Sequence, residues 1–152
     1  MVEYHNDYLR HRSKGETSPI GITFSAFDLL HAGHCEMLKE AKSRSDYLIA
    51  CIHVNPFIEN KMKQTPFQSL VERWIVLQSN KYVDEIIPYQ TEEEVIQILK
   101  LKNPTIRIIG EDYIGKDFTG KDYCNKMGIM IYYNKRKHDI SSSSKRSKIK
   151  NG

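Results

Sequence analysis

The sequence predicts a single doubly wound, Rossmann-like α/β domain with a mainly parallel five-stranded sheet. The chain has 152 residues, 39% of them hydrophobic, which suits one compact core. Residues 46–54 form a nearly continuous apolar run, typical of a strand that is covered on both faces, as in parallel sheets. β-prone and helical segments alternate along the chain, as expected when helices connect parallel strands.

The first three elements follow in the order strand, helix, strand. A β-prone segment at 20–24 comes first, and the run at 46–54 is the second strand. Between them, Cys35, Leu38 and Ala41 recur at helical spacing with charged residues on the other side, which predicts an amphipathic helix. The expected helices are 33–42, 69–80 and 92–102, and the expected strands are 20–24, 46–54, 83–88, 106–110 and 129–133.

The two ends of the chain differ from this pattern. Residues 1–19 are polar and lack an apolar period, so we expect an N-terminal extension before a domain that spans residues 20–149. Four basic residues follow a serine run near the C-terminus, but the formal net charge is only +4. We therefore expect a solvated end and no nucleic-acid partner.

The composition also bears on location. No apolar run has the length of a signal peptide core or of a membrane span, so a cytoplasmic protein with no membrane partner is expected. The three cysteines are widely spaced and form no C-x-x-C pair, a pattern that indicates neither a zinc site nor a redox motif.

The densest group of chemically useful residues is F-D-L-L-H-A-G-H at 27–34, which follows the first strand and leads into the first helix. Ligands of doubly wound sheets bind at this edge. His31 and His34 can face one phosphate at the helix N-terminus, where backbone amides and the helix dipole favour anions. From their spacing alone, the two histidines could equally be a metal-binding pair or ordinary polar side chains.

The whole string resembles the signature of the cytidylyltransferase-like nucleotidyltransferases, most of all that of the glycerol-3-phosphate cytidylyltransferase branch. Similar segments follow in the family's order. They are V-E-R at 71–73, Y-V-D-E-I-I-P at 82–88, I-I-G-E-D-Y at 108–113 and R-K-H-D-I-S-S-S at 136–143. The segment at 108–113 resembles the family's loop that meets the nucleotide base.

This resemblance implies transfer of CMP from CTP to a polyol phosphate such as glycerol 3-phosphate, with release of pyrophosphate. Mg²⁺ is expected with the triphosphate, and apolar surface on the helix of Trp74 together with the resemblance predicts a homodimer. Two alternatives stay open: adenylyl transfer to a sugar or coenzyme-precursor phosphate, and a non-catalytic nucleotide-binding domain.

The resemblance also implies roles for individual residues. The expected catalytic residues are His31, His34, Lys61 and Arg136. The expected nucleotide-binding residues are Phe24, Phe27, Asp28, Gly33, Arg73, Gly110, Glu111, Asp112, Ser141, Ser142 and Ser143. Lys63 is expected to bind the acceptor, and no protein ligand set for a metal is visible.

Simpler interpretations compete for several of these residues. Lys61 and Lys63 could be ordinary surface lysines, and Arg73 could form a buried salt bridge. Asp28 could only cap the helix that follows it, and residues 110–112 could form a plain turn.

Overall fold

The computed structural model describes residues 18–135, and within them one sheet of five strands has the order β3-β2-β1-β4-β5. Every strand pair in this sheet is parallel. The strands are β1 (Ile20–Ser25), β2 (Tyr47–His53), β3 (Glu85–Tyr89), β4 (Ile106–Gly110) and β5 (Met130–Asn134). The predicted parallel, five-stranded α/β fold is therefore confirmed.

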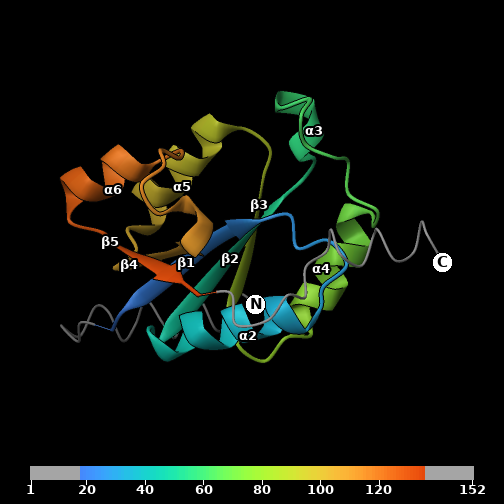
Figure 1. Cartoon of the computed structure of the whole chain (residues 1–152). Helices are drawn as coiled ribbons and strands as arrows, with labels where there is room; N and C mark the ends of the chain where they lie inside the picture. Colours follow the sequence, from blue (N-terminus) through green and yellow to red (C-terminus); the bar gives the residue numbers. More distant parts are fainter. Residues whose placement is uncertain (1–17, 136–152) are drawn as a thin grey trace.

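Helices cover both faces of the sheet (Figure 1). On one face lie α2 (Ala32–Ser43) and α4 (Leu70–Gln78), and on the other lie α5 (Glu92–Lys102) and α6 (Lys121–Met127). A short helix, α3 (Pro56–Glu59), follows β2, and a 3₁₀ turn, η1 (Glu111–Tyr113), follows β4. Among the residues described, no helix is long and apolar enough to cross a bilayer.

The two-sided cover explains the apolar run of β2. Leu48 and Ile52 pack into the core beneath α2 and α4, whereas Ile49 and Cys51 pack into the core beneath α5 and α6. All four side chains are at most 1% exposed. A strand buried on both faces shows no polar alternation, and this is why its sequence is continuously hydrophobic.

Helix caps determine most of the boundaries. The predicted helix at 92–102 and the predicted strand at 106–110 are confirmed to the residue. Ser69 begins α4 through a capping box with Glu72, and Thr91 begins α5 in the same way with Glu94. The remaining predicted elements differ from the observed ones by one or two residues at an end.

Three short elements, α3, η1 and α6, were not predicted. The first two have only 4 and 3 residues, too few for a periodic pattern. Helix α6 has 7 residues and lies between Gly120 and Gly128, both in the left-handed region. Its boundaries come from backbone conformation, which an apolar period does not reveal.

Candidate active site

His31 and His34 cap the N-terminus of α2 with their own rings. The Nδ1 atom of His31 accepts a hydrogen bond from the Gly33 amide at 3.0 Å, and Nδ1 of His34 accepts one from the His31 amide at 3.2 Å. The two imidazoles thus occupy the positions that Ser or Thr and Glu or Gln take in an ordinary capping box. The ring centroids are 4.0 Å apart, so the motif holds both rings side by side at the helix entrance.

This cap also determines the tautomer of each neutral ring. A nitrogen that accepts a hydrogen bond from an amide carries no proton, so the proton of each neutral imidazole lies on Nε2. Nε2 is on the edge of the ring turned away from the amide. Each histidine is therefore an N–H donor beside a helix N-terminus, the chemistry that suits phosphate oxygens.

The signature loop is held in shape by the segment before α4. Phe27 and Leu29 have φ angles of 51° and 49°, in the left-handed region that side chains rarely adopt. Asp28 accepts hydrogen bonds from the amides of Phe67 at 2.9 Å and Gln68 at 3.0 Å. In return, Oε1 of Gln68 accepts from the Leu29 amide at 2.9 Å. The alternative that Asp28 caps the following helix is wrong, because His31 is the cap.

Arg73 binds backbone carbonyls. Its side chain is buried, with a relative exposure of 2%. The guanidinium donates to four carbonyl oxygens, those of Ala26, His53, Val54 and Gln68, at 2.6–3.2 Å. Within residues 18–135 no carboxylate pairs with it, so the alternative of a buried salt bridge finds no partner there. Four of its five N–H groups are engaged by the backbone, and contact with a nucleotide stays a prediction.

The two phenylalanines that we expected to bind the nucleotide have different neighbours. Phe27 is buried, and its ring centroid lies 6.1 Å from that of His34. Phe24 points to the α5 and α6 side, where its ring packs edge-on against Tyr89 and beneath the guanidinium of Arg107. The Gly33 amide is used by the helix cap. Contact of these residues with a nucleotide likewise remains a prediction.

The turn after β4 brings Gly110, Glu111 and Asp112 to the same edge of the sheet. Gly110 has a steric reason to be glycine, because a Cβ atom there would lie 2.5 Å from Oδ1 of Asp112. Glu111 and Asp112 form the first part of η1. The turn is thus compact and adjoins the strand next to the signature strand.

The predicted lysines are on the surface after α3. Lys61 is exposed, and its ammonium lies 4.2 Å from the ring centroid of Phe57. Lys63 is also exposed, and its charge helps to lower the pKa of His53. Both lysines are therefore on the loop that leaves the carboxyl end of β2. Arg136 and the serines at 141–143 lie outside the described residues.

Sequence reasoning missed a polar group at the ends of β2 and β3. His53 donates from Nε2 to the Gln90 carbonyl at 3.1 Å, and its ring stacks on Tyr89 with centroids 4.5 Å apart. Asn55 and Gln90 exchange two hydrogen bonds of 2.9 Å. In the sequence, a histidine and an asparagine at the end of the apolar run, His53 and Asn55, could have indicated this polar group.

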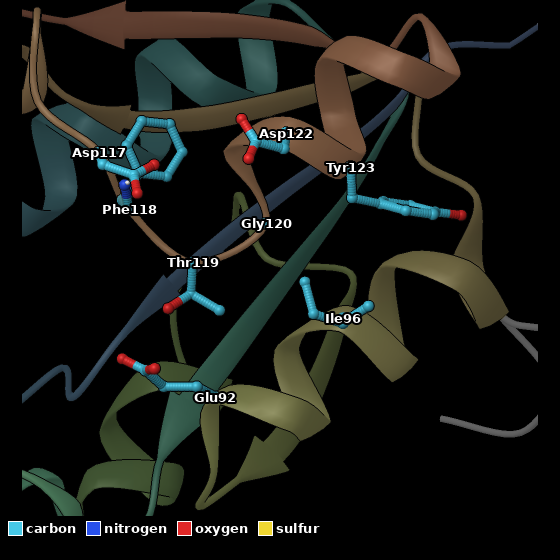
Figure 2. A pocket seen from close by; sticks show the side chains of 8 residues that line it. All are labelled: Glu92, Ile96, Asp117, Phe118, Thr119, Gly120, Asp122 and Tyr123. Atoms are coloured by element: carbon cyan, nitrogen blue, oxygen red, sulfur yellow. Dashed lines mark hydrogen bonds between the residues drawn. The ribbon is translucent and has the colours of Figure 1, made fainter.

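A cavity of about 500 Å³ lies elsewhere, between α5 and the segment that leads into α6 (Figure 2). Its lining residues are Glu92, Ile96, Asp117, Phe118, Thr119, Gly120, Asp122 and Tyr123. None of them was predicted to belong to the site. Three carboxylates line this cavity and no cationic side chain does, so it does not suit a triphosphate.

Comparison with known proteins shows the family of the chain. A model of the cytidylyltransferase-like family matches residues 22–148. Glycerol-3-phosphate cytidylyltransferase of Bacillus subtilis is 36% identical over 92 residues, which cover 60% of this chain and 70% of that protein. FAD synthase of Thermococcus sibiricus is 34% identical over 91 residues, or 60% of this chain and 62% of that one.

A solved structure supports the fold. The lipopolysaccharide core biosynthesis protein from Thermoplasma volcanium superposes with a TM-score of 0.63 at 24% identity. The match covers 81% of this chain and 99% of the other. The sheet and its helices are therefore an arrangement that other proteins share.

Proposed function

The chain is a nucleotidyltransferase of the cytidylyltransferase-like family, and on this premise we propose that it transfers CMP from CTP to a polyol phosphate such as glycerol 3-phosphate. The observation that carries the proposal is the pair of imidazoles at the start of α2, whose caps place both protons on Nε2. The relative named as a glycerol-3-phosphate cytidylyltransferase supports the choice of nucleotide and acceptor.

In the proposed reaction, an oxygen of the acceptor phosphate attacks the α-phosphorus of CTP. The bond from that phosphorus to the bridging oxygen breaks, and pyrophosphate leaves with the electron pair. Negative charge gathers on phosphate oxygens in the transition state, and donors placed beforehand stabilise it. His31 and His34 donate from Nε2 to these oxygens, and the N-terminus of α2 adds its amides and dipole.

Other groups complete the proposed site. Lys61 binds the phosphates of the nucleotide and Lys63 the phosphate of the acceptor. Arg136 with Ser141, Ser142 and Ser143 also binds the triphosphate. Both oxygens of Asp28 accept backbone amides, so Mg²⁺ would be held chiefly by the triphosphate, whose charge it would neutralise. We further propose that the enzyme works as a homodimer in the cytoplasm.

Adenylyl transfer to a phosphorylated acceptor is the second candidate. The relative named as an FAD synthase favours it, because a phosphate-binding histidine pair serves either base equally well. The family assignment and the names of the relatives argue against a non-catalytic domain.

The first experiment screens triphosphates and acceptors with the full chain. CTP, ATP, GTP and UTP are each combined with glycerol 3-phosphate, ribitol 5-phosphate, ethanolamine phosphate and a hexose 1-phosphate, and acceptor-dependent pyrophosphate release is measured. We expect turnover with CTP and a polyol phosphate. Turnover with ATP alone would select the second candidate.

The second experiment removes the imidazoles while keeping the helix cap. His31→Asn leaves a good N-cap acceptor, and His34→Gln leaves a residue that completes a capping box. We expect each variant to lose two or more orders of magnitude in turnover, about 2.7 kcal/mol of transition-state stabilisation. As a control, Thr91→Ala removes the matching cap from α5, on the other face of the sheet, and should leave turnover within a few fold. Unchanged turnover in both histidine variants would contradict the proposal.

A further inference from the structure

Arg107, the second residue of β4, is a buried cation. Its side chain is 5% exposed and lies in the layer between the sheet and helices α5 and α6. No carboxylate of the described part of the chain pairs with it. Nη1 donates to the carbonyl of Thr119, and the thiol of Cys124 is a second hydrogen-bond partner.

Two aromatic rings make cation–π contacts with the guanidinium of Arg107. Its Cζ atom lies 4.8 Å from the ring centroid of Phe24 and 4.9 Å from that of Phe118. Phe118 in turn meets Tyr113 of η1 edge-on, with centroids 5.9 Å apart. Arg107 thus connects β1, just before the signature loop, to the segment 110–120 that follows its own strand.

The backbone of this segment is pressed against the arginine. Gly120 has a φ angle of +86°, and a Cβ atom there would lie 2.8 Å from Nη1 of Arg107 and 2.8 Å from Leu99. On its other side the segment borders the open cavity of Figure 2. The segment is therefore packed against Arg107 and the two rings on one side, and the cavity leaves its other side without such packing.

Stability alone does not account for an arginine here. A buried charge without a counter-charge is costly, and an apolar side chain of similar volume often replaces such a group without loss. A guanidinium offers what an apolar chain lacks, namely cation–π contacts with two rings and a directed donor to a carbonyl.

We propose that Arg107 is a positioning residue that holds the 110–120 segment, and with it the turn at Gly110–Asp112, in the shape that binds the base of the triphosphate. The inference rests on the proposed function, because it takes this turn to meet the base. It adds a residue that neither the motif nor the spacing of the sequence indicated.

The test compares Arg107→Met, Arg107→Lys and Arg44→Met with the wild type. Arg44 is an exposed arginine 4.6 Å above the ring of Tyr132, so its variant removes a cation–π contact on the face of the sheet opposite α5 and α6. Titration calorimetry with Mg-CTP and Mg-ATP measures nucleotide affinity without an acceptor. We expect Arg107→Met to weaken CTP binding at least tenfold and to reduce the preference for CTP over ATP, while melting at or above the wild-type temperature.

Arg107→Lys keeps a cation beside the two rings and should recover at least half of the lost CTP affinity on a logarithmic scale. Arg44→Met should bind CTP like the wild type.

A glycine pair adds a second comparison. Gly120→Ala pushes the segment off Arg107 and should weaken CTP binding. Gly128→Ala carries a similar strain at φ +73°, with no atom within 4 Å of the added Cβ and outside segment 110–120, and it should not.

Hydrogen exchange tests the positioning itself. The amides of Ile114 and Lys116 bond to the carbonyls of Glu111 and Tyr113, and Arg107→Met should speed their exchange at least tenfold. Unchanged exchange, or CTP binding as tight as in the wild type, would overturn the inference. Failure of the wild type to bind any nucleotide, with exchange in Arg107→Met accelerated as expected, would instead overturn the proposed function and leave a purely structural role for the arginine.

Discussion

Three histidines at the carboxyl edge of the sheet all carry the proton of the neutral ring on Nε2, but they use it differently. His31 and His34 accept amides through Nδ1 and present Nε2–H at a helix N-terminus. His53 uses its Nε2–H to bond the Gln90 carbonyl. Burial lowers the pKa of His53 below its ordinary 6.5, and the charges of Lys63 and Arg73 lower it further. The fold therefore favours the neutral form of His53.

This pKa shift predicts a pH dependence of stability. The unfolded chain takes up a proton at His53 near pH 6.5, whereas the folded chain takes it up only at lower pH. The contribution is thus fully present above pH 6.5 and is lost as the pH falls through the folded pKa. Urea denaturation from pH 8 to pH 5 should show a larger fall in the free energy of unfolding for the wild type than for His53→Gln. Parallel curves would show that His53 does not titrate as its surroundings indicate.

At the scale of elements, the signature loop and helix α4 form one unit. The loop between β1 and α2 contains two non-glycine residues with positive φ, and a strained backbone persists only when its neighbours hold it. The hydrogen bonds between Asp28, Leu29 and the segment 67–68 provide this support across about 40 residues of chain. The histidines are therefore placed partly by residues outside their own motif.

We accordingly expect Asp28→Asn to lower the free energy of unfolding by about 2 kcal/mol. An asparagine has one carbonyl oxygen, so one of the two amides now bound by Asp28 loses its charged acceptor. Urea denaturation at pH 7 measures the effect, with the exposed Asp46→Asn as the control. Equal stability of the two variants would show that the carboxylate does not hold the loop.

At the scale of the whole molecule, Arg73 joins three parts of the chain. Its guanidinium contacts the exit of β1 at Ala26, the exit of β2 at His53 and Val54, and the segment before its own helix at Gln68. The carbonyls of Ala26, His53 and Val54 lie at or just beyond the ends of their strands. One planar side chain thus completes hydrogen bonding at the edge where the candidate site is built.

Loss of this group should therefore destabilise the whole domain. We expect Arg73→Met to lower the free energy of unfolding by about 3 kcal/mol or more, because four partly buried carbonyls lose their donor. Arg73→Lys should recover only a part, since one ammonium cannot reach all four oxygens. Thermal and urea unfolding measure both, and Arg44→Lys is the surface control. A wild-type melting curve for Arg73→Met would refute this account.

Much of the fold was predictable because its signals are local. The continuous run of β2 and the capping boxes of α4 and α5 depend on residues close together in the sequence. The histidine pair was equally visible, because its two members share one helical turn. The short helix α6 was not, since glycines in left-handed conformation define it.

The sequence by itself thus determined the α/β class, the order of the main elements and the placing of two histidines at the first strand-to-helix turn. Only the tertiary structure decided the strand order β3-β2-β1-β4-β5 and what surrounds those histidines. Asp28 accepts a hydrogen bond from the Phe67 amide, and Arg73 donates one to the Ala26 carbonyl. Arg107 makes cation–π contacts with Phe24 and Phe118. Crossover connections create such contacts, and a periodic pattern, which records only near neighbours along the chain, does not encode them.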